Sequence, residues 1–205
     1  WIDPKDFNYH AKLYQTASTA TFPYRTSTSG GVPFGSGLNT LSKFPFSNFD
    51  RVKWDECSNA SENDCFTRKG FTSMTVVLPG GLEVDFYNLH ADAGVKGDDL
   101  KARADNLDQL ARAITDRNPS GGGGGSRGGD RAVVVMGDTN SRYTRSGDVI
   151  PSFLEKTALT DSWVQLARTG GQPPRAGDSA LVCTTTTSSS PKPPDNGCEV
   201  VDKIM

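Results

Sequence analysis

The sequence predicts an α+β protein that is rich in loops, and three observations support this. Only 35% of the 205 residues are apolar, and 22 Gly and 12 Pro favour turns and loops over a helical bundle. Two runs of β-branched and aromatic residues, 71–78 and 82–89, flank the turn signal Pro79-Gly80-Gly81 and predict a β-hairpin. The segment 98–117 has the apolar spacing of an amphipathic helix. Strands and at least one long helix are therefore expected in the same chain.

The region before the hairpin predicts short strands and turns. Residues 15–50 are dense in Ser, Thr, Gly, Pro and Phe and show no sustained helical period. One strand is expected over 38–46, ending at Pro45. In the second arm of the hairpin, Leu82, Val84 and Phe86 are expected to share one face, because side chains alternate along a strand.

The predicted helix is followed by a glycine-rich stretch. Asp98 or Asp99 is the expected N-cap, and Asn118-Pro119 ends the helix. Its apolar positions recur at 3.6-residue spacing: Leu100, Ala104, Leu107, Ala111 and Ile114. A phosphate-cradling loop is the alternative for 120–130, but no Gly-Lys-Ser/Thr occurs there and no helix follows, so we expect a flexible surface loop.

The remaining chain predicts one apolar strand and several short elements. Residues 132–136 are wholly apolar and predict a central strand buried on both faces. The other expected elements are a helical turn at 153–158, strands at 161–166 and 200–205, and an extended or disordered Ser/Thr/Pro-rich segment at 184–194. No internal repeat or linker divides the chain, so 1–205 is predicted to be a single domain.

The four cysteines predict two local disulfides. Cys57 lies close to Cys65 and Cys183 close to Cys198, each pair in a segment with little core of its own. Zinc is the competing use of Cys, but there is no Cys-x-x-Cys and there are only two His. Disulfides indicate an oxidising compartment, and the sequon at Asn59 inside the first pair predicts N-glycosylation.

Charge and hydropathy exclude two classes of protein. The net charge is −2 and the sequence pI is about 5.7, whereas proteins that coat nucleic acid by electrostatics alone carry a basic excess. The longest apolar runs are far below the ~20 residues that cross a bilayer. The opening Trp1-Ile2-Asp3-Pro4 is untypical of a natural start, which suggests a processed or incomplete chain.

Polar residues that could do chemistry follow three predicted strands. His90 ends the second arm of the hairpin, although a lone His after a strand is more often structural. Asp138 and Asn140 follow the apolar strand 132–136 and are expected to point the same way, with an Asx-turn as the structural alternative. Asp202 interrupts a β-rich run and says little alone.

Taken in order, these residues resemble the endonuclease/exonuclease/phosphatase superfamily, which has the deoxyribonuclease-I-like fold. The resemblance spans nearly all of the chain, and the stretch from Trp54 through Asp64 to Lys69-Gly70 resembles its sphingomyelinase and phospholipase-C branch. The matching pieces are Gly37-Leu38, Leu41-Ser42-Lys43-Phe44-Pro45, Lys69-Gly70-Phe71, Tyr87-Asn88-Leu89-His90, Gly137-Asp138-Thr139-Asn140 and Val201-Asp202-Lys203-Ile204.

The resemblance implies a four-layer α/β/β/α sandwich of two mostly antiparallel sheets, and a secreted phosphodiester hydrolase dependent on Mg²⁺ or Mn²⁺. His90 would donate a hydrogen bond or proton to the phosphate or the leaving oxygen. Asp138 would orient or deprotonate the attacking water, Asn140 would bind a phosphate oxygen, and both would be metal ligands. Asp202 would orient a second histidine. The cation would offset the acidity of the cleft, and the substrate could be nucleic acid or a phospholipid head group.

Two departures from the family pattern affect this interpretation. Residues 6–10 resemble the segment after the family's Gln-Glu pair, whose Glu binds metal, yet Lys5 stands at the apparent match. The terminal Ser-Asp-His of the family is absent after Met205. The expectation is a domain incomplete at both ends, with a catalytically inactive binding protein on the same scaffold as the alternative. A carbohydrate- or surface-binding β-sandwich is a third possibility, but it leaves residues 137–140 unexplained.

Overall fold

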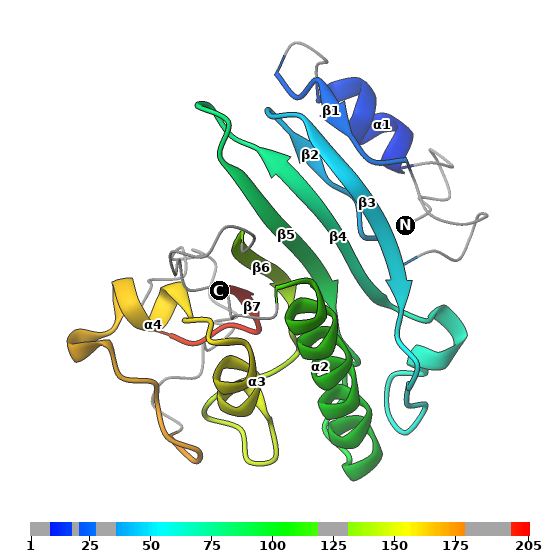
Figure 1. Ribbon diagram of the computed structural model, residues 1–205. Coiled ribbons are helices and arrows are strands. Elements are labelled where there is room, and N and C mark those ends of the chain that lie inside the picture. Colours follow the sequence, from blue (N-terminus) through cyan, green and yellow to red (C-terminus); the bar gives the residue numbers. More distant parts are fainter. Residues whose placement is uncertain (1–8, 18–20, 28–35, 119–130, 179–197) are drawn as a thin grey trace, which may run out of the picture.

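A computed structural model of the chain describes residues 9–17, 21–27, 36–118, 131–178 and 198–205. The described helices and strands follow the order α1 (Tyr9–Thr16), β1 (Tyr24–Arg25), β2 (Leu41–Ser42), β3 (Phe46–Lys53), the 3-10 turn η1 (Asp64–Thr67), β4 (Gly70–Val77), β5 (Glu83–His90), α2 (Gly97–Arg117), β6 (Ala132–Asp138), α3 (Ile150–Thr157), α4 (Ser162–Ala167), the 3-10 turn η2 (Thr169–Gly171) and β7 (Asp202–Ile204) (Figure 1). The α+β prediction is confirmed.

Five strands form one sheet in the order β3-β4-β5-β6-β7. Only the β5–β6 pair is parallel, and the other three pairs are antiparallel. The parallel pair is joined through α2, as a parallel connection requires a crossover. Both strands of the parallel pair therefore end at the same edge of the sheet.

Helices α2 and α3 cover one face of this sheet. Apolar side chains of α2, such as Leu107, Leu110 and Ile114, are 0–2% exposed and belong to the same core cluster as Leu89 and Val135 of the sheet. The cluster also includes Ile150 and Phe153 of α3. Burial of these side chains is the main driving force that fixes the crossover helix on the sheet.

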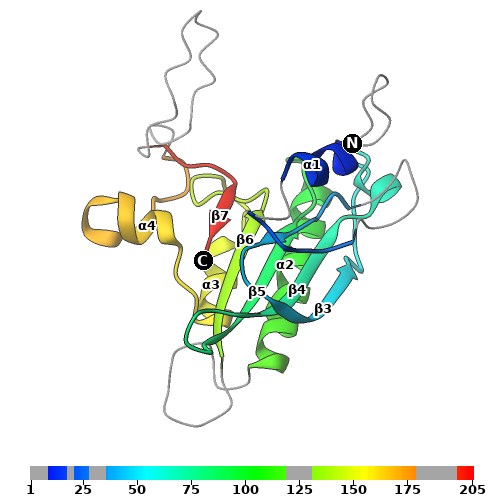
Figure 2. The ribbon, with the colours of Figure 1, turned by 90° about the horizontal axis from the view of Figure 1, so that it is seen from above.

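The opposite face is partly covered by a second, two-stranded sheet. Strands β1 and β2 pair antiparallel, and α1 contacts the residue that follows β1, because the hydroxyl of Tyr14 donates to the carbonyl of Thr26 at 2.7 Å. Helix α1 lies next to β1 at one side of the molecule, and α4 lies beside β7 at the other (Figures 1 and 2). Among the described residues, no helix is long and apolar enough to span a bilayer.

The hairpin, the long helix and the last strand agree with the sequence prediction. Strands β4 and β5 pair from Gly70↔His90 to Val77↔Glu83, and α2 matches its predicted range within one residue. The N-cap of α2 is Lys96, so the prediction that Asp98 or Asp99 is the N-cap is wrong. Asp99 instead accepts a hydrogen bond from the backbone N–H of Lys96. Leu82 lies in the turn and is 58% exposed, whereas Val84 in the strand is buried.

Other expectations need correction. The segment predicted as one strand over 38–46 is divided between β2 and β3. The strand predicted at 161–166 is helix α4, because the side chain of Asp161 accepts from Trp163 N at 2.9 Å and caps a helix there. Strand β6 is interior, but only Val133 and Val135 are buried, and Val134 and Met136 are half-buried.

The first local disulfide is confirmed. Cys57 and Cys65 are bonded, and their Cα atoms are 5.3 Å apart. Cys198 is also in a disulfide, while its predicted partner Cys183 lies outside the described residues. The segments 120–130 and 184–194 lie outside them as well, as does Lys5.

Candidate active site

Three of the four predicted catalytic residues form one row across the sheet. His90 of β5 is in register with Asp138 of β6, and Asp138 is in register with Asp202 of β7. Paired residues project from the same face, here the face opposite α2. The distance from His90 Nε2 to Asp138 Oδ2 is 3.5 Å, and both side chains are about one-third exposed. The row is therefore accessible to a ligand.

Gly137 shapes the backbone that delivers Asp138. Its φ is +130°, and a Cβ at this position would lie 2.2 Å from the carbonyl oxygen of Leu89. Glycine is the residue that tolerates both this dihedral and this close approach. The tight exit of β6 thus depends on the Gly in Gly137-Asp138.

Asn140, the fourth predicted residue, is held against the same edge of β5. Its backbone has φ of 49°, its N–H donates to Asp138 Oδ1 at 2.8 Å, and its Nδ2 donates to the carbonyl of Ala91 at 2.9 Å. The Asx-turn considered from the sequence is therefore present. Because the amide N–H₂ is engaged with Ala91, the amide oxygen is the group left to meet an external ligand.

The surroundings of His90 keep its imidazole neutral. Burial lowers the pKa of His90 below its usual range, and the positive charge of Lys69 lowers it further, while nearby carboxylates, Asp138 first among them, act in the opposite direction. The buried Trp54 donates from Nε1 to the carbonyl of His90 at 2.7 Å and fixes the end of β5. A neutral imidazole retains one N–H as a hydrogen-bond donor.

Lys69 belongs to the Lys69-Gly70-Phe71 piece that resembles the family, but the sequence predicted no role for it. Its Nζ lies 2.9 Å from Asp64 Oδ1 and 3.4 Å from the carbonyl of Ala91, and both charged side chains are largely buried. A cation so close to His90 suits a phosphate oxygen. The signal for this role was its place directly before Gly70, the register partner of His90.

Two carboxylates stand next to each other at the end of the row. Partial desolvation raises the pKa of Asp202, and the negative charge of Asp138 raises it further. A cation near the pair would relieve this repulsion, and carboxylate and amide oxygens are ligands that Mg²⁺ prefers. Within the described part of the chain, however, no three His, Cys, Asp or Glu side chains gather into a metal cluster.

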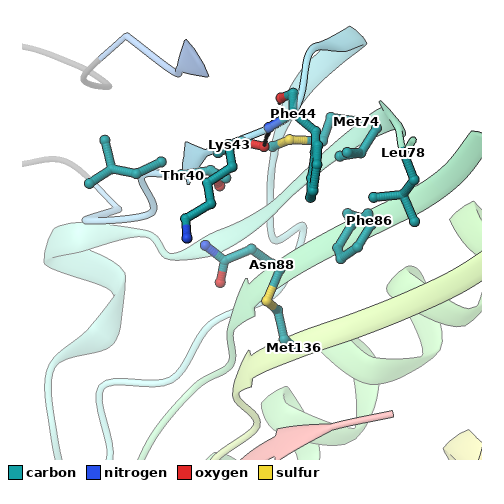
Figure 3. A pocket seen from close by; sticks show the side chains of 11 residues that line it. Thr40, Lys43, Phe44, Met74, Leu78, Phe86, Asn88 and Met136 are labelled. Atoms are coloured by element: carbon teal, nitrogen blue, oxygen red, sulfur yellow. Dashed lines mark hydrogen bonds between the residues drawn. The ribbon is translucent and has the colours of Figure 1, made fainter. Parts of the chain in front are cut away.

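A pocket of about 250 Å³ lies on the same face of the sheet as the row of His90, Asp138 and Asp202, and residues that precede the row on β5 and β6 line it (Figure 3). Asn88 and Met136 line it, and each precedes a residue of the row by two positions on its strand. Lys43 and Asn88 form its polar end in Figure 3. The other lining residues are mostly apolar: Thr40, Leu41, Ser42, Phe44, Met74, Val76, Leu78 and Phe86.

The sheet order places His90, Asp138 and Asp202 on adjacent strands, in the order that the family resemblance implies. Residues 5–176 match the model of endonuclease/exonuclease/phosphatase family 2. The chain belongs to this family.

Among curated proteins, the chain is similar to a sphingomyelinase of Mycobacterium tuberculosis, with 36% identity over 205 residues, 98% of the chain. The chain spans 36% of the length of that relative. The family and the sphingomyelinase branch expected from the sequence are thereby confirmed.

Solved structures support the fold. A crystal structure of an endonuclease/exonuclease/phosphatase from Beutenbergia cavernae superposes with a TM-score of 0.61 and 15% identity. The match covers 97% of this chain and 50% of the Beutenbergia protein. A variant of beta toxin from Staphylococcus aureus with bound magnesium ions superposes with a TM-score of 0.56 and 16% identity. The match covers 74% of this chain and 54% of the beta toxin chain. The predicted fold class, a deoxyribonuclease-I-like α/β/β/α sandwich, is confirmed.

Proposed function

We propose that this chain carries the active site of a metal-dependent hydrolase of phospholipid phosphodiesters, with choline lipids of the sphingomyelin type as substrates. The observation that carries the proposal is the row of His90, Asp138 and Asp202 at the end of β5, β6 and β7. The similarity to a sphingomyelinase supports the choice of lipid over nucleic acid. The net charge of −2 supports it too, because a polyanion would gain little from this surface.

His90 and Asp138 divide the acid–base work in this proposal. The neutral imidazole of His90 donates a hydrogen bond to a phosphate oxygen or to the leaving oxygen, and Lys69 adds positive charge beside it. Asp138 orients the attacking water and accepts its proton. By resemblance, Asp202 orients a further histidine.

The donor set fits a divalent cation in part. Asp138 supplies a carboxylate oxygen and Asn140 an amide oxygen, and Mg²⁺ commonly completes its six-coordinate shell with water and substrate phosphate oxygens. A bound cation would neutralise phosphate charge during hydrolysis. Magnesium is favoured over manganese by the magnesium ions of the beta toxin variant.

Secretion is the proposed localisation. The Cys57–Cys65 disulfide supports an oxidising compartment. Pairing of Cys183 with Cys198 and a glycan at the exposed Asn59 stay predictions. Peptide mapping without reduction and intact mass of the secreted protein test them, and a Cys57 link to either distant cysteine would contradict local pairing.

The decisive experiment is a hydrolysis screen on the full-length protein, with sphingomyelin, phosphatidylcholine, DNA, RNA and a chromogenic phosphodiester as substrates, each with Mg²⁺, with Mn²⁺ and with a chelator. Turnover of choline lipids that needs the cation is expected. His90→Ala and Asp138→Ala should each lower turnover by about 10²-fold or more, the scale of a lost acid–base or water-orienting group.

Asp116→Ala is the matched control, because Asp116 is exposed near the end of α2, away from the row. Its turnover should equal that of the wild type. Near-normal rates in both site variants would reject this site. Choline-lipid binding without turnover under any condition would favour the inactive binding protein instead.

A further inference from the structure

A buried ion pair joins helix α2 to the loop that carries Asn140. Arg103 of α2 and Asp148, in the loop 139–149 between β6 and α3, have side chains that are 1% and 0% exposed. The guanidinium of Arg103 donates to Asp148 Oδ1 from Nε at 3.1 Å and from Nη2 at 2.7 Å. Neither residue has a part in the proposed acid–base chemistry.

Asp148 also fixes the loop from within. Its Oδ2 accepts from the backbone N–H of Arg142 at 2.8 Å and from Nε of Arg145 at 2.6 Å. The Nη2 of Arg145 in turn donates to the backbone carbonyl of Asn140. Two hydrogen bonds on each carboxylate oxygen fill the acceptor capacity of Asp148, so the buried charge is fully compensated.

The guanidinium of Arg103 also holds the other side of the site. Its Nη1 donates to the carbonyls of Asp92 and Gly94 at 3.0 Å each, in the connection from β5 to α2. Ala91 opens the same connection, and its carbonyl accepts from Asn140 Nδ2 at 2.9 Å. Arg103 therefore ties together the two segments that the Asn140 amide bridges.

Stability alone does not account for a buried ion pair at this place. Removing two charges from water costs free energy, and well-packed apolar residues often stabilise a core as well. The pair adds direction, because a guanidinium presents its N–H donors in a rigid plane. Arg103 uses these donors on acceptors from two segments, and this contact set fixes the separation of the segments.

We infer that Arg103 and Asp148 are positioning residues, which hold the Asn140 amide beside the end of β5 so that its oxygen faces a divalent cation at a fixed distance from His90. The inference rests on the proposed function for the ligand that the amide oxygen meets. In this role neither residue touches the ligand, and each acts through the loop 139–149. Loss of the pair should therefore weaken cation binding, as does loss of other groups that orient metal ligands.

Two measurements on the full-length protein without substrate test the inference. They are amide hydrogen exchange of the segment 139–149, followed by mass spectrometry, and titration calorimetry with Mg²⁺. Asp148→Asn keeps the shape of the side chain but replaces one acceptor oxygen by a donor. Exchange in the segment should become faster, and the dissociation constant for Mg²⁺ should rise by about tenfold or more. If Asp148→Asn does not fold, Arg103→Lys, which keeps the charge but loses the planar fork, decides by the same measurements.

Two control variants separate positioning from stability. Ile114→Ala removes a buried apolar side chain near the other end of α2 and should also lower the urea midpoint. Asp108→Asn breaks the exposed ion pair of α2 with Lys156 of α3, whose Nζ and Oδ1 atoms are 2.6 Å apart. Neither control should change the Mg²⁺ dissociation constant or the exchange of the segment 139–149.

Unchanged Mg²⁺ affinity in both Asp148→Asn and Arg103→Lys would overturn the inference. So would absence of Mg²⁺ binding by the wild type. An equal weakening of Mg²⁺ binding in Ile114→Ala would overturn it too, because the effect would then follow from lost stability.

Hydrolysis assays on the full-length protein separate this inference from the proposed function. With the chromogenic phosphodiester, Asp148→Asn should need about tenfold more Mg²⁺ for half-maximal turnover, whereas a variant that is merely less stable loses rate without a shift in this concentration. A wild type whose Mg²⁺ binding depends on Asp148 but which hydrolyses no phosphodiester would contradict the proposed function and leave the positioning role standing. Wild-type turnover with unchanged Mg²⁺ dependence in Asp148→Asn would do the reverse.

Discussion

At the residue scale, the site depends on single positions whose neighbours the sequence could not reveal. For the motif Gly137-Asp138-Thr139-Asn140 the sequence predicted that Asp138 and Asn140 point the same way, with an Asx-turn as the alternative, and the Asx-turn is present. The partner of the Asn140 amide, the carbonyl of Ala91, is 49 positions away and is set by strand register. The pairing of Lys69 with Asp64 likewise depends on the packing of η1 against the end of β5, which local patterns do not encode.

Replacing Gly137 by Ala should destabilise the backbone at the exit of β6. The new Cβ would meet the Leu89 carbonyl at 2.2 Å in a backbone conformation with φ of +130°. We expect the free energy of unfolding to fall by about 2 kcal/mol or more, and turnover to fall with it, because Asp138 is the next residue. Urea denaturation of the chain measures the loss of stability, and the chromogenic assay on the full-length protein measures the loss of turnover.

Gly97→Ala is the control for this change. Gly97 opens α2 and a Cβ there meets nothing within 4 Å. Its stability should be unchanged or slightly higher, by up to about 1 kcal/mol, since Ala favours helix. A Gly137→Ala protein as stable as Gly97→Ala would contradict the geometry described for the exit of β6.

At the element scale, long elements with a strong period were predictable and short ones were not. Helix α2 and the β4–β5 hairpin carry their own periodicity and turn signal. Helix α4 has six residues with an apolar run that also fits a strand, and the N-cap contact of Asp161 decided its form. The N-cap of α2 was predicted at the wrong residue, because the Asp99 carboxylate accepts hydrogen bonds from the distant Ser58 and Ser61 as well as from the helix start.

These contacts to Asp99 make the junction of α2 with the disulfide loop sensitive to acid. Asp99 is 1% exposed. Burial alone would raise its pKa, but hydrogen bonds from Ser58 and Ser61 and from the Lys96 backbone outweigh burial and hold the pKa below its usual value. The carboxylate therefore stabilises the fold above the ordinary Asp pKa of about 4, and this contribution is lost as pH falls through the lowered pKa.

Asp99→Asn should lower the free energy of unfolding by about 1–3 kcal/mol at neutral pH, because buried donors lose a charged acceptor. The difference in free energy of unfolding between Asp99→Asn and the wild type should narrow as pH falls below about 4. Denaturant titrations across this range give the measurement. Asp98→Asn, an exposed change in the same helical turn, should cost no more than about 0.5 kcal/mol. A gap for Asp99→Asn that is constant with pH would contradict the assigned role.

At the scale of the whole molecule, the order of the motifs predicted the fold better than any single element did. The strands that carry His90, Asp138 and Asp202 are adjacent in the sheet, as the family order implies. The packing of the two sheet faces was less predictable, because Val134 and Met136 of the apolar strand are only half-buried on the side of the smaller sheet. The single-domain organisation of 1–205 stays a prediction.

The same whole-molecule view predicts weak metal binding by the chain of residues 1–205 on its own. Its described part offers Mg²⁺ a carboxylate from Asp138 and an amide oxygen from Asn140, but no cluster of three acidic, imidazole or thiolate side chains. By resemblance, Lys5, which lies outside the described residues, takes the position of the family's metal-binding Glu, and a cation at that position would oppose Mg²⁺ by Coulomb repulsion. Since Mg²⁺ gives up its hydration water reluctantly, two protein oxygens should hold it with a dissociation constant of about 1 mM or weaker, and turnover should be absent. Isothermal titration with Mg²⁺ and Mn²⁺, with Asp138→Asn as the control, measures this directly. A dissociation constant tighter than about 1 mM that Asp138→Asn weakens, together with turnover, would show that further ligands complete the site and that Lys5 does not occupy the position of the Glu.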